Sequence, residues 1–167
     1  AAQSFVGDSW DLSSVTTDVN AMGPLNILNA IRVVDQKIKF YQASTSELYG
    51  NSDEKSQNEN TRFKPSSPYA IAKLHAYWAT VNFRNSYNMF CCNGILFNHE
   101  SPIRGIEFVT RKITDGVAQI FYGKKQSISL GNIESKRDWG FAGDYVEAMW
   151  LMMQNKKSDD YVIASNK

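Results

Sequence analysis

The sequence predicts an α/β domain with a mainly parallel sheet, and three observations support this fold class. Stretches of strand composition alternate along the chain with stretches of helical periodicity. Residues 89–97, MFCCNGILF, form an apolar run of strand length, as expected for a strand that is covered on both faces. Hydroxyl and carboxylate side chains follow a predicted strand at residues 43–47, ASTSE, and open α/β sheets bind their ligands at such strand ends.

The first part of the chain predicts a helix, a strand and a loop. Residues 16–34 place apolar side chains at three- and four-residue spacings, which indicates a helix, although Gly23-Pro24 interrupts it with a residue that lacks a backbone donor. Residues 37–44 alternate and are rich in aromatic and branched side chains, so a strand is predicted there. The polar run 51–61 has no apolar anchor and is predicted to be a surface loop.

A second helix is predicted over residues 69–87, because Pro65 and Pro68 suit the first turn of a helix but not its interior. Its buried stripe is expected to run through Ala72, Ala76, Trp78, Val81 and Phe83 or their neighbours. After the strand at 89–97, the rest of the chain predicts a loop over 98–105, a helix over 108–122, a short strand over 127–130, a loop over 131–140, an amphipathic helix over 144–154 with Asp144 at its start, and a last strand over 161–164.

Composition excludes several classes of protein. Hydrophobic residues make up 43% of the chain and charged residues 21%, which is typical of a folded globular protein. No apolar run approaches the ~20 residues that span a bilayer. Because 18 basic and 17 acidic residues give a net charge of +1, we expect no nucleic-acid partner. Cys91 and Cys92 are adjacent and no Cys or His spacing suggests a metal, so we expect a reduced, cytoplasmic protein without a metal site.

The two ends of the chain do not look like natural boundaries. The sequence opens on AAQSFVG, without an initiator Met or a signal peptide, and closes on DDYVIASNK, which predicts a strand that runs into the terminus. We therefore expect an internal fragment, with residues 1–167 forming a single partial domain.

Tyr69 and Lys73, in the stretch YAIAK, are the most informative pair of residues. On a helix they lie one turn apart on the same face. A nearby ammonium favours phenolate and lowers the pKa of a tyrosine from about 10, which makes it a general base. An isolated pair of this spacing is usually coincidental, but here Thr45 and Glu47 follow a predicted strand at the edge where ligands bind.

A strand-end serine or threonine with a downstream YxxxK resembles the extended short-chain dehydrogenase/reductase family. Five longer stretches narrow the resemblance to the GDP-mannose 4,6-dehydratase family: FYQASTSELYG, SPYAIAKLHAYW, NGILFNHESP, FVTRKIT and KRDWGFAGDYVEAMWLM. The resemblance covers nearly the whole chain. It implies part of a Rossmann-like, doubly wound parallel sheet that lacks its N-terminal glycine-rich half, because no GxGxxG or GxxGxxG occurs in the sequence.

The resemblance also implies a lyase of GDP-fucose biosynthesis that dehydrates GDP-mannose to GDP-4-dehydro-6-deoxy-mannose with NADP. Thr45 would hydrogen-bond the hexose 4-hydroxyl, and Tyr69 would take its proton while the hydride leaves C4 for NADP. Lys73 would hold the nicotinamide ribose. Glu47 would then remove the C5 proton and help expel the 6-hydroxyl as water, before the hydride returns to C6.

Further positions match the binding residues of the family. The cofactor positions are Ala1, Ala2, Gln3, Ser4, Lys73, His99 and Arg104, and the substrate positions are Ser46, Asn98, Lys112 and Arg137. Amide and cationic groups suit a diphosphate. Two neutral interpretations stay open: His99 as a satisfied loop histidine, and Arg137-Asp138 as a surface pair. The family also implies a homo-oligomer, either a dimer or a tetramer.

The sequence departs from the family pattern at five positions. Val15 replaces a tyrosine, Phe5 a histidine and Ile103 the first arginine of SPRRG. Phe141 and Gly143 replace a histidine and a lysine. The alternatives are therefore another nucleotide-sugar enzyme of the same fold, such as an epimerase, against which Glu47 argues, or a non-catalytic truncated paralogue. We expect the 167-residue chain alone to be inactive, because it lacks the phosphate-binding turn.

Overall fold

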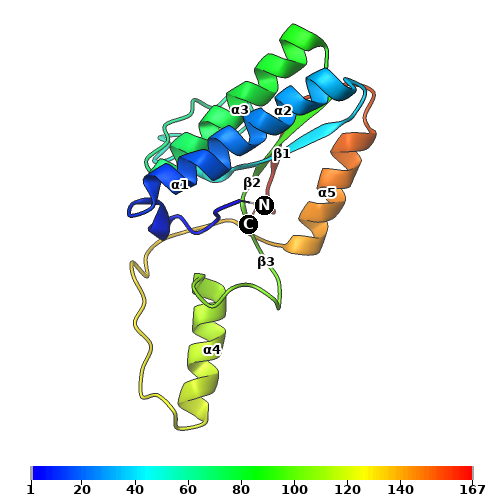
Figure 1. Cartoon of the computed structure of the whole chain (residues 1–167). Coiled ribbons are helices and arrows are strands. Elements are labelled where there is room, and N and C mark those ends of the chain that lie inside the picture. Colours follow the sequence, from blue (N-terminus) through cyan, green and yellow to red (C-terminus); the bar gives the residue numbers. More distant parts are fainter. Residues whose placement is uncertain (1, 167) are drawn as a thin grey trace.

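Three parallel strands form the main sheet of the computed structural model, which describes residues 2–166. They are β1 (Phe40–Thr45), β2 (Cys91–Leu96) and β5 (Asp160–Ile163), in the order β1-β2-β5. Helices α2 (Gly23–Val34) and α3 (Pro68–Tyr87) lie side by side on one side of the sheet, and α5 (Ala142–Gln154) lies on the other (Figure 1). The predicted α/β class with a parallel sheet is confirmed.

The predicted first helix is confirmed and begins a little earlier, at residue 13. It consists of α1 (Ser13–Thr17), a π-helical turn η2 (Asp18–Met22) and α2. In the wider turn, the backbone N–H of Gly23 donates to the carbonyl oxygen of Asp18. Pro24 consequently falls in the first turn of α2, the part of a helix that tolerates proline.

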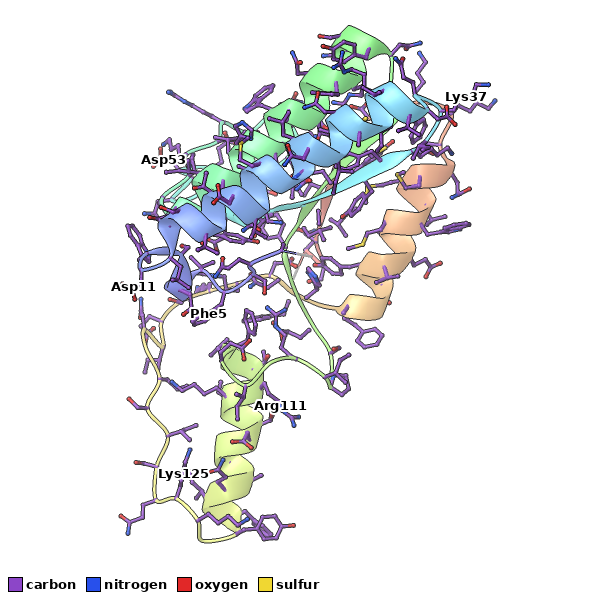
Figure 2. The ribbon with its side chains drawn as sticks, viewed as in Figure 1. Phe5, Asp11, Lys37, Asp53, Arg111 and Lys125 are labelled. Carbon is purple, nitrogen blue, oxygen red and sulfur yellow. The ribbon has the colours of Figure 1, made fainter. Side chains whose placement is uncertain are left out.

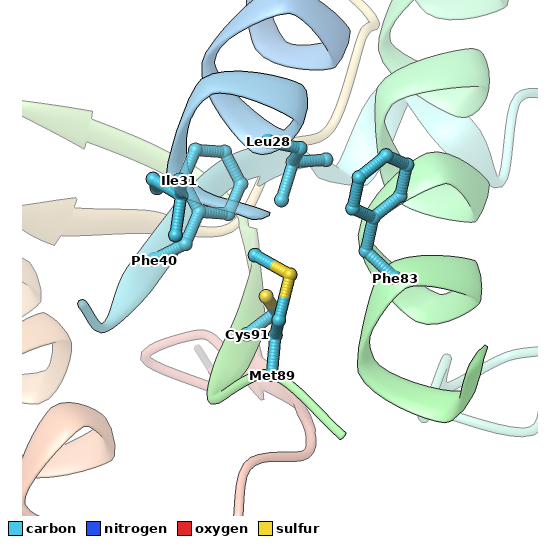
Figure 3. Close-up of a cluster of buried hydrophobic side chains, with 6 residues drawn as sticks. All are labelled: Leu28, Ile31, Phe40, Phe83, Met89 and Cys91. Carbon is cyan, nitrogen blue, oxygen red and sulfur yellow. The ribbon is translucent and has the colours of Figure 1, made fainter. Parts of the chain in front are cut away.

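Strand β1 begins at Phe40 rather than at the predicted residue 37. The backbone N–H of Lys37 donates to the carboxylate of Asp35 at 2.9 Å, and this turn delays the strand. All six residues of β2 are buried, as its apolar sequence predicted. Figure 3 shows the cluster that joins the sheet to its helices, made of Leu28, Ile31, Phe40, Phe83, Met89 and Cys91.

Helix α3 has strong signals at both ends. The Ser67 hydroxyl oxygen accepts a hydrogen bond from the Ala70 N–H at 3.1 Å, and Asn88 ends the helix in the left-handed conformation with φ of 53°. The expected buried stripe is wrong at Trp78, which is 55% exposed, whereas its neighbour Tyr77 is buried. Tyr77 reaches the sheet because its hydroxyl donates to the Asp160 carboxylate at 2.8 Å.

A largely buried ion pair fixes α3 against the sheet. The Arg84 guanidinium lies 2.9 Å from the Asp160 carboxylate at the start of β5, and both side chains are 14% exposed. Asn93 of β2 donates to the same carboxylate at 2.8 Å. The helix that carries Tyr69 and Lys73 therefore has a fixed position relative to β1 and β2.

Three predictions for the second half of the chain are wrong. Residues 98–105 and 131–140 were expected to be loops only, but β3 (Asn98–Glu100) and β4 (Trp139–Phe141) pair in parallel. Residues 127–130 form no strand; Ile128 instead packs on Gly116 of α4 (Val109–Phe121), so their alternation reflects packing on a helix.

The other predictions for this half are confirmed. The helix predicted over 108–122 is α4, the one over 144–154 is α5 with Asp144 in its first turn, and the last strand is β5. Helix α4 extends away from the main sheet, and Arg111 and Lys125 mark this part of the chain (Figures 1 and 2). None of the helices within residues 2–166 is both long and apolar enough to cross a membrane.

Candidate active site

Thr45 is the last residue of β1, and a short 3₁₀ turn, η3 (Ser46–Leu48), follows it. The Thr45 hydroxyl oxygen accepts a hydrogen bond from the backbone N–H of Glu47 at 3.2 Å and so caps this turn. Leu48 is fully buried, which fixes the far end of the turn. Glu47 is therefore held at the carboxyl end of the strand, as the sequence predicted.

Tyr69 and Lys73 come to the same place from the first turns of α3. Both are buried, with exposed fractions of 9% and 6%. The Thr45 side chain lies near enough to the Tyr69 phenol to lower its pKa, and both side chains line the same cavity. The Lys73 ammonium lies 5.7 Å from the centre of the Tyr69 ring and donates a hydrogen bond to the carbonyl oxygen of Ala43 at 3.0 Å. Four residues from β1, η3 and α3 thus converge.

The electrostatics of this group differ from the sequence-based prediction. Burial raises the pKa of the Tyr69 phenol above its usual value, and the Glu47 carboxylate raises it further, while the Thr45 side chain and Arg104 lower it. The prediction that Lys73 lowers the pKa of Tyr69 below its usual value is therefore wrong for this arrangement. The ammonium instead donates its hydrogen bond to the carbonyl oxygen of Ala43. Burial also lowers the pKa of Lys73 itself to about 8.

Thr45, Glu47, Tyr69 and Lys73 all line one cavity of about 390 Å³. Its wall also includes Ala2, Ser4, Phe5, Ser46, Leu96, Asn98, His99, Arg104, Phe108 and Met149. Hydroxyl and cationic groups here face an apolar wall, which suits a flat ring joined to a ribose, so the residues present fit a nicotinamide cofactor. Within residues 2–166, the His, Cys, Asp and Glu side chains form no cluster suited to a metal ion.

His99 and Arg104 are both fixed in the wall of this cavity. The Nδ1 atom of His99 lies 2.8 Å from the carbonyl oxygen of Phe97, and because a carbonyl only accepts, Nδ1 carries the proton. The His99 ring stacks on Tyr145 with centroids 4.6 Å apart. Arg104 pairs with Glu100 at 3.2 Å and lies over the Phe108 ring at 3.4 Å.

The N-terminal segment approaches the cavity along η2. Asn20 is buried, and its side-chain amide exchanges two hydrogen bonds with the backbone of Gln3, at 3.1 and 2.8 Å. Ala2 and Ser4 consequently line the cavity, while the side-chain oxygen of Gln3 is buried with no hydrogen-bond partner in the described part of the chain. Ala1 lies outside the described residues.

The predicted substrate residues are distributed over three cavities. Ser46 and Asn98 line both the catalytic cavity and an adjoining polar cavity of about 710 Å³, and exposed Arg137 lines the second of these. Lys112 lies apart from them, in a cavity of about 490 Å³ between α4 and residues 127–129. The structure therefore brings three of the four together.

Local sequence patterns did not indicate the contacts of three further residues. Met149 of α5 lines the catalytic cavity. Glu54 and Glu59 are exposed, as predicted for a surface loop, and they also accept hydrogen bonds from the Thr61 hydroxyl at 2.7 Å and the Val162 N–H at 2.8 Å. The contact that ties Glu59 to β5 spans 103 positions of sequence, so no local signal could have revealed it.

The five departures from the family pattern lie mostly in exposed positions. Phe5 packs edge-on against Phe108 at 5.6 Å in the cavity wall. Ile103 is 93% exposed, and Val15, Phe141 and Gly143 are exposed as well. None of the five contacts Thr45, Glu47, Tyr69 or Lys73 through a hydrogen bond or ring contact that the described part of the chain contains.

Comparisons with known proteins give a consistent result. The family model described as GDP-mannose 4,6 dehydratase matches residues 1–167. The GDP-mannose 4,6 dehydratase of Drosophila melanogaster is 57% identical over all of this chain and 43% of its own length, and the human one is 56% identical over 99% of this chain and 45% of its own length. The chain spans less than half the length of these curated relatives.

Solved structures support the fold. RMD from Pseudomonas aeruginosa, complexed with NADPH, matches all of this chain and 59% of its own with a TM-score of 0.93 at 23% identity. DesIV, a dTDP-glucose 4,6-dehydratase from Streptomyces venezuelae with NAD bound, matches 98% of this chain and 49% of its own with a TM-score of 0.86 at 23% identity. At these identities the likeness establishes a shared Rossmann-type fold.

Proposed function

The chain belongs to the GDP-mannose 4,6-dehydratase family, and from this premise we propose that the protein containing it converts GDP-mannose to GDP-4-dehydro-6-deoxy-mannose and water. The observation that supports this proposal most directly is that Thr45, Glu47, Tyr69 and Lys73 line one cavity. A buried phenol beside a hydroxyl suits proton removal from an alcohol. A separate carboxylate at the same strand end supplies the second acid/base group that an elimination needs.

In the first step we assign Thr45 to the 4-hydroxyl of the hexose and Tyr69 to its proton. The two side chains line the same cavity and interact with each other, so one sugar hydroxyl can reach both. Because burial raises the pKa of Tyr69, the phenolate requires a positive charge at the site when the reaction begins. NADP bound in this cavity would supply the hydride acceptor for C4, the hydride donor for C6 and such a positive charge close to Tyr69.

In the second step we assign Glu47 to the C5 proton. The 4-keto group makes this proton acidic. When the Glu47 carboxylate removes it, the electron pair left at C5 forms a C5=C6 double bond and the C6 hydroxyl takes up a proton and leaves as water. A hydride added at C6 and the proton returned to C5 from the Glu47 carboxyl then complete the product. Water is lost and the sugar undergoes no net oxidation, which makes the enzyme a lyase.

We propose that NADP is held by the residues matched to it in the sequence. They are Ala1, Ala2, Gln3, Ser4, Lys73, His99 and Arg104, with Ser46, Asn98, Lys112 and Arg137 assigned to GDP-mannose. The Lys73 ammonium, held on the Ala43 carbonyl, is assigned to the nicotinamide ribose. Ala2 and Ser4 line the catalytic cavity, which supports the assignment of this segment to the cofactor.

We further propose that the protein is cytoplasmic and forms a homo-oligomer, either a dimer or a tetramer. Residues 1–167 would form one partial domain of each subunit and be inactive alone. Ile27 of α2 and Ile71 and Trp78 of α3 support self-association, because all three are more than half exposed on neighbouring helices.

Isotope transfer tests the reaction. The full-length protein is incubated with NADP and GDP-mannose that carries deuterium at C4, and the sugar product is examined by NMR and mass spectrometry. A 4,6-dehydratase moves the deuterium to C6 and the product loses one water. A product that keeps its C6 hydroxyl and carries the deuterium at C4 with inverted configuration would indicate an epimerase. Unchanged GDP-mannose would indicate a non-catalytic paralogue.

A further inference from the structure

We propose that Lys55 binds the diphosphate group of the nucleotide-sugar substrate, in the polar cavity of about 710 Å³ that adjoins the catalytic cavity. The identity of this substrate rests on the proposed function. The placement of an anionic group there rests on the loop that carries Lys55, on the charges around the cavity and on the connection between the two cavities.

The loop over residues 51–61 is a fixed wall, although its sequence is polar throughout. At its base, a Cβ atom on Gly50, where φ is +53°, would collide with the Lys64 carbonyl, so the two ends of the loop are closely packed. The Tyr49 hydroxyl donates to the Asn58 carbonyl at 2.9 Å, and the Glu59 carboxylate accepts from Val162 of β5 at 2.8 Å. Lys55 is thus presented to the cavity from a backbone held on both sides.

The acidic neighbours of Lys55 are already engaged. Asp53 pairs with Lys64 at 2.5 Å, and Glu54 accepts from the Thr61 hydroxyl at 2.7 Å. Lys55 itself has no ion pair or side-chain hydrogen bond within residues 2–166. Its ammonium therefore faces the cavity without a compensating anion.

Two more cations line the same cavity from the segment before β4. Lys136 has no ion pair in the part of the chain that the structure describes, and the Arg137 guanidinium donates to the Lys136 carbonyl oxygen at 2.8 Å. The adjacent Asp138 carboxylate accepts from the backbone N–H groups of Ser165 and Asn166 at 2.9 and 2.6 Å, which spreads its charge. An anion in this cavity is therefore favoured.

The connection between the cavities indicates which anion fits. Ser46, Glu47, Phe97 and Asn98 line both of them. In a nucleotide sugar the diphosphate is bonded directly to the hexose. A hexose placed against Thr45 and Glu47 can therefore extend its diphosphate past Asn98 into the cavity that Lys55, Lys136 and Arg137 surround.

Calorimetric titration with GDP and with guanosine tests this assignment. In the full-length protein, Lys55→Gln is expected to weaken GDP binding roughly three- to tenfold, the range for one charged contact at an accessible site, and to leave guanosine binding unchanged. Lys55→Arg should restore most of the affinity for GDP. The matched control is Lys157→Gln, which removes an exposed lysine at the opposite end of β5 and should bind GDP like the wild type.

Equal GDP affinity of Lys55→Gln and the wild type would overturn the assignment, and so would an equal loss of GDP and guanosine affinity, which would mean a general disturbance of the loop. The outcome is separate from that of the isotope experiment. A wild type that binds GDP through Lys55 but transfers no deuterium contradicts the proposed function alone, whereas deuterium transfer with unchanged GDP affinity in Lys55→Gln contradicts this inference alone.

Discussion

The Lys73 ammonium lies 3.0 Å from the carbonyl oxygen of Ala43, so a side chain from α3 is hydrogen bonded to the backbone of β1 next to Thr45. This contact holds the cation at the strand end, 5.7 Å from the centre of the Tyr69 ring. It is made inside the protein, where burial lowers the pKa of Lys73 to about 8. The active-site cation is consequently a source of pH-dependent instability.

We predict that Lys73→Met changes the pH dependence of stability. Because the folded pKa of about 8 is below the ordinary value of 10.5, the unfolded chain binds more protons between these two values. The contribution of Lys73 to the free energy of unfolding is therefore lowest below pH 8 and rises towards pH 10.5, by up to ~3 kcal/mol at 1.36 kcal/mol per pKa unit.

Urea unfolding of both proteins at pH 7 and pH 10 measures this effect. The wild type should gain stability relative to Lys73→Met as the pH rises. Lys157→Met, at an exposed position, is the control and should show no such change relative to the wild type. The same difference in unfolding free energy at both pH values for Lys73→Met would contradict the prediction.

Tyr69→Phe should nearly abolish the oxidation at C4 in the full-length protein. The substitution removes the phenol oxygen, which lies in the cavity beside Thr45, and leaves the ring in place. A positioned general base contributes ~10²–10⁴-fold to the rate, and the loss should be of this size. Single-turnover reduction of bound NADP measures it. The control is Tyr122→Phe, at an exposed position after α4, which should react at the wild-type rate. A wild-type rate for Tyr69→Phe would show that Tyr69 has no catalytic role.

Asp160→Asn should destabilise the protein strongly. Asp160 accepts hydrogen bonds from Arg84, Asn93 and Tyr77, and its loss leaves a largely buried guanidinium without its counterion. Removal of one partner of a buried ion pair typically costs ~3–5 kcal/mol. Asp53→Asn is the matched control, since it breaks the exposed ion pair with Lys64 and should change little. Chemical denaturation of both variants measures the difference, and similar stabilities would mean that the Arg84 contact is unimportant.

Local patterns predicted most of the fold. The apolar run of β2, the capped helix α3 and the amphipathic helix α5 all formed where periodicity indicated. The pairing of β3 with β4 was missed because it joins residue 98 to residue 139, and no local signal encodes such a pairing. Tyr77 is buried where Trp78 was expected, and its burial depends on a hydrogen bond to the carboxylate of Asp160, which is distant in sequence.

The candidate site was predictable for a similar reason. Thr45 and Glu47 follow a parallel strand and Tyr69 begins the next helix, so the topology itself brings them to one edge of the sheet. Two features were not predictable. The direction of the pKa of Tyr69 depends on its burial, and the position of Lys112 depends on how α4 extends from the sheet.

Glu47→Gln should separate the two half-reactions. The amide keeps the size of the side chain and the backbone contact of residue 47 with Thr45, so the oxidation at C4 should continue. Loss of the carboxylate base should slow the elimination of water by ~10²–10⁴-fold. In deuterated water the full-length variant should therefore accumulate reduced cofactor and a 4-keto sugar with little deuterium at C5, as followed by absorbance and NMR. The exposed Glu147→Gln is the control and should behave like the wild type. Release of 6-deoxy product from Glu47→Gln at the wild-type rate, with full deuterium at C5, would mean that Glu47 only belongs to the turn after β1 and that another group removes the C5 proton.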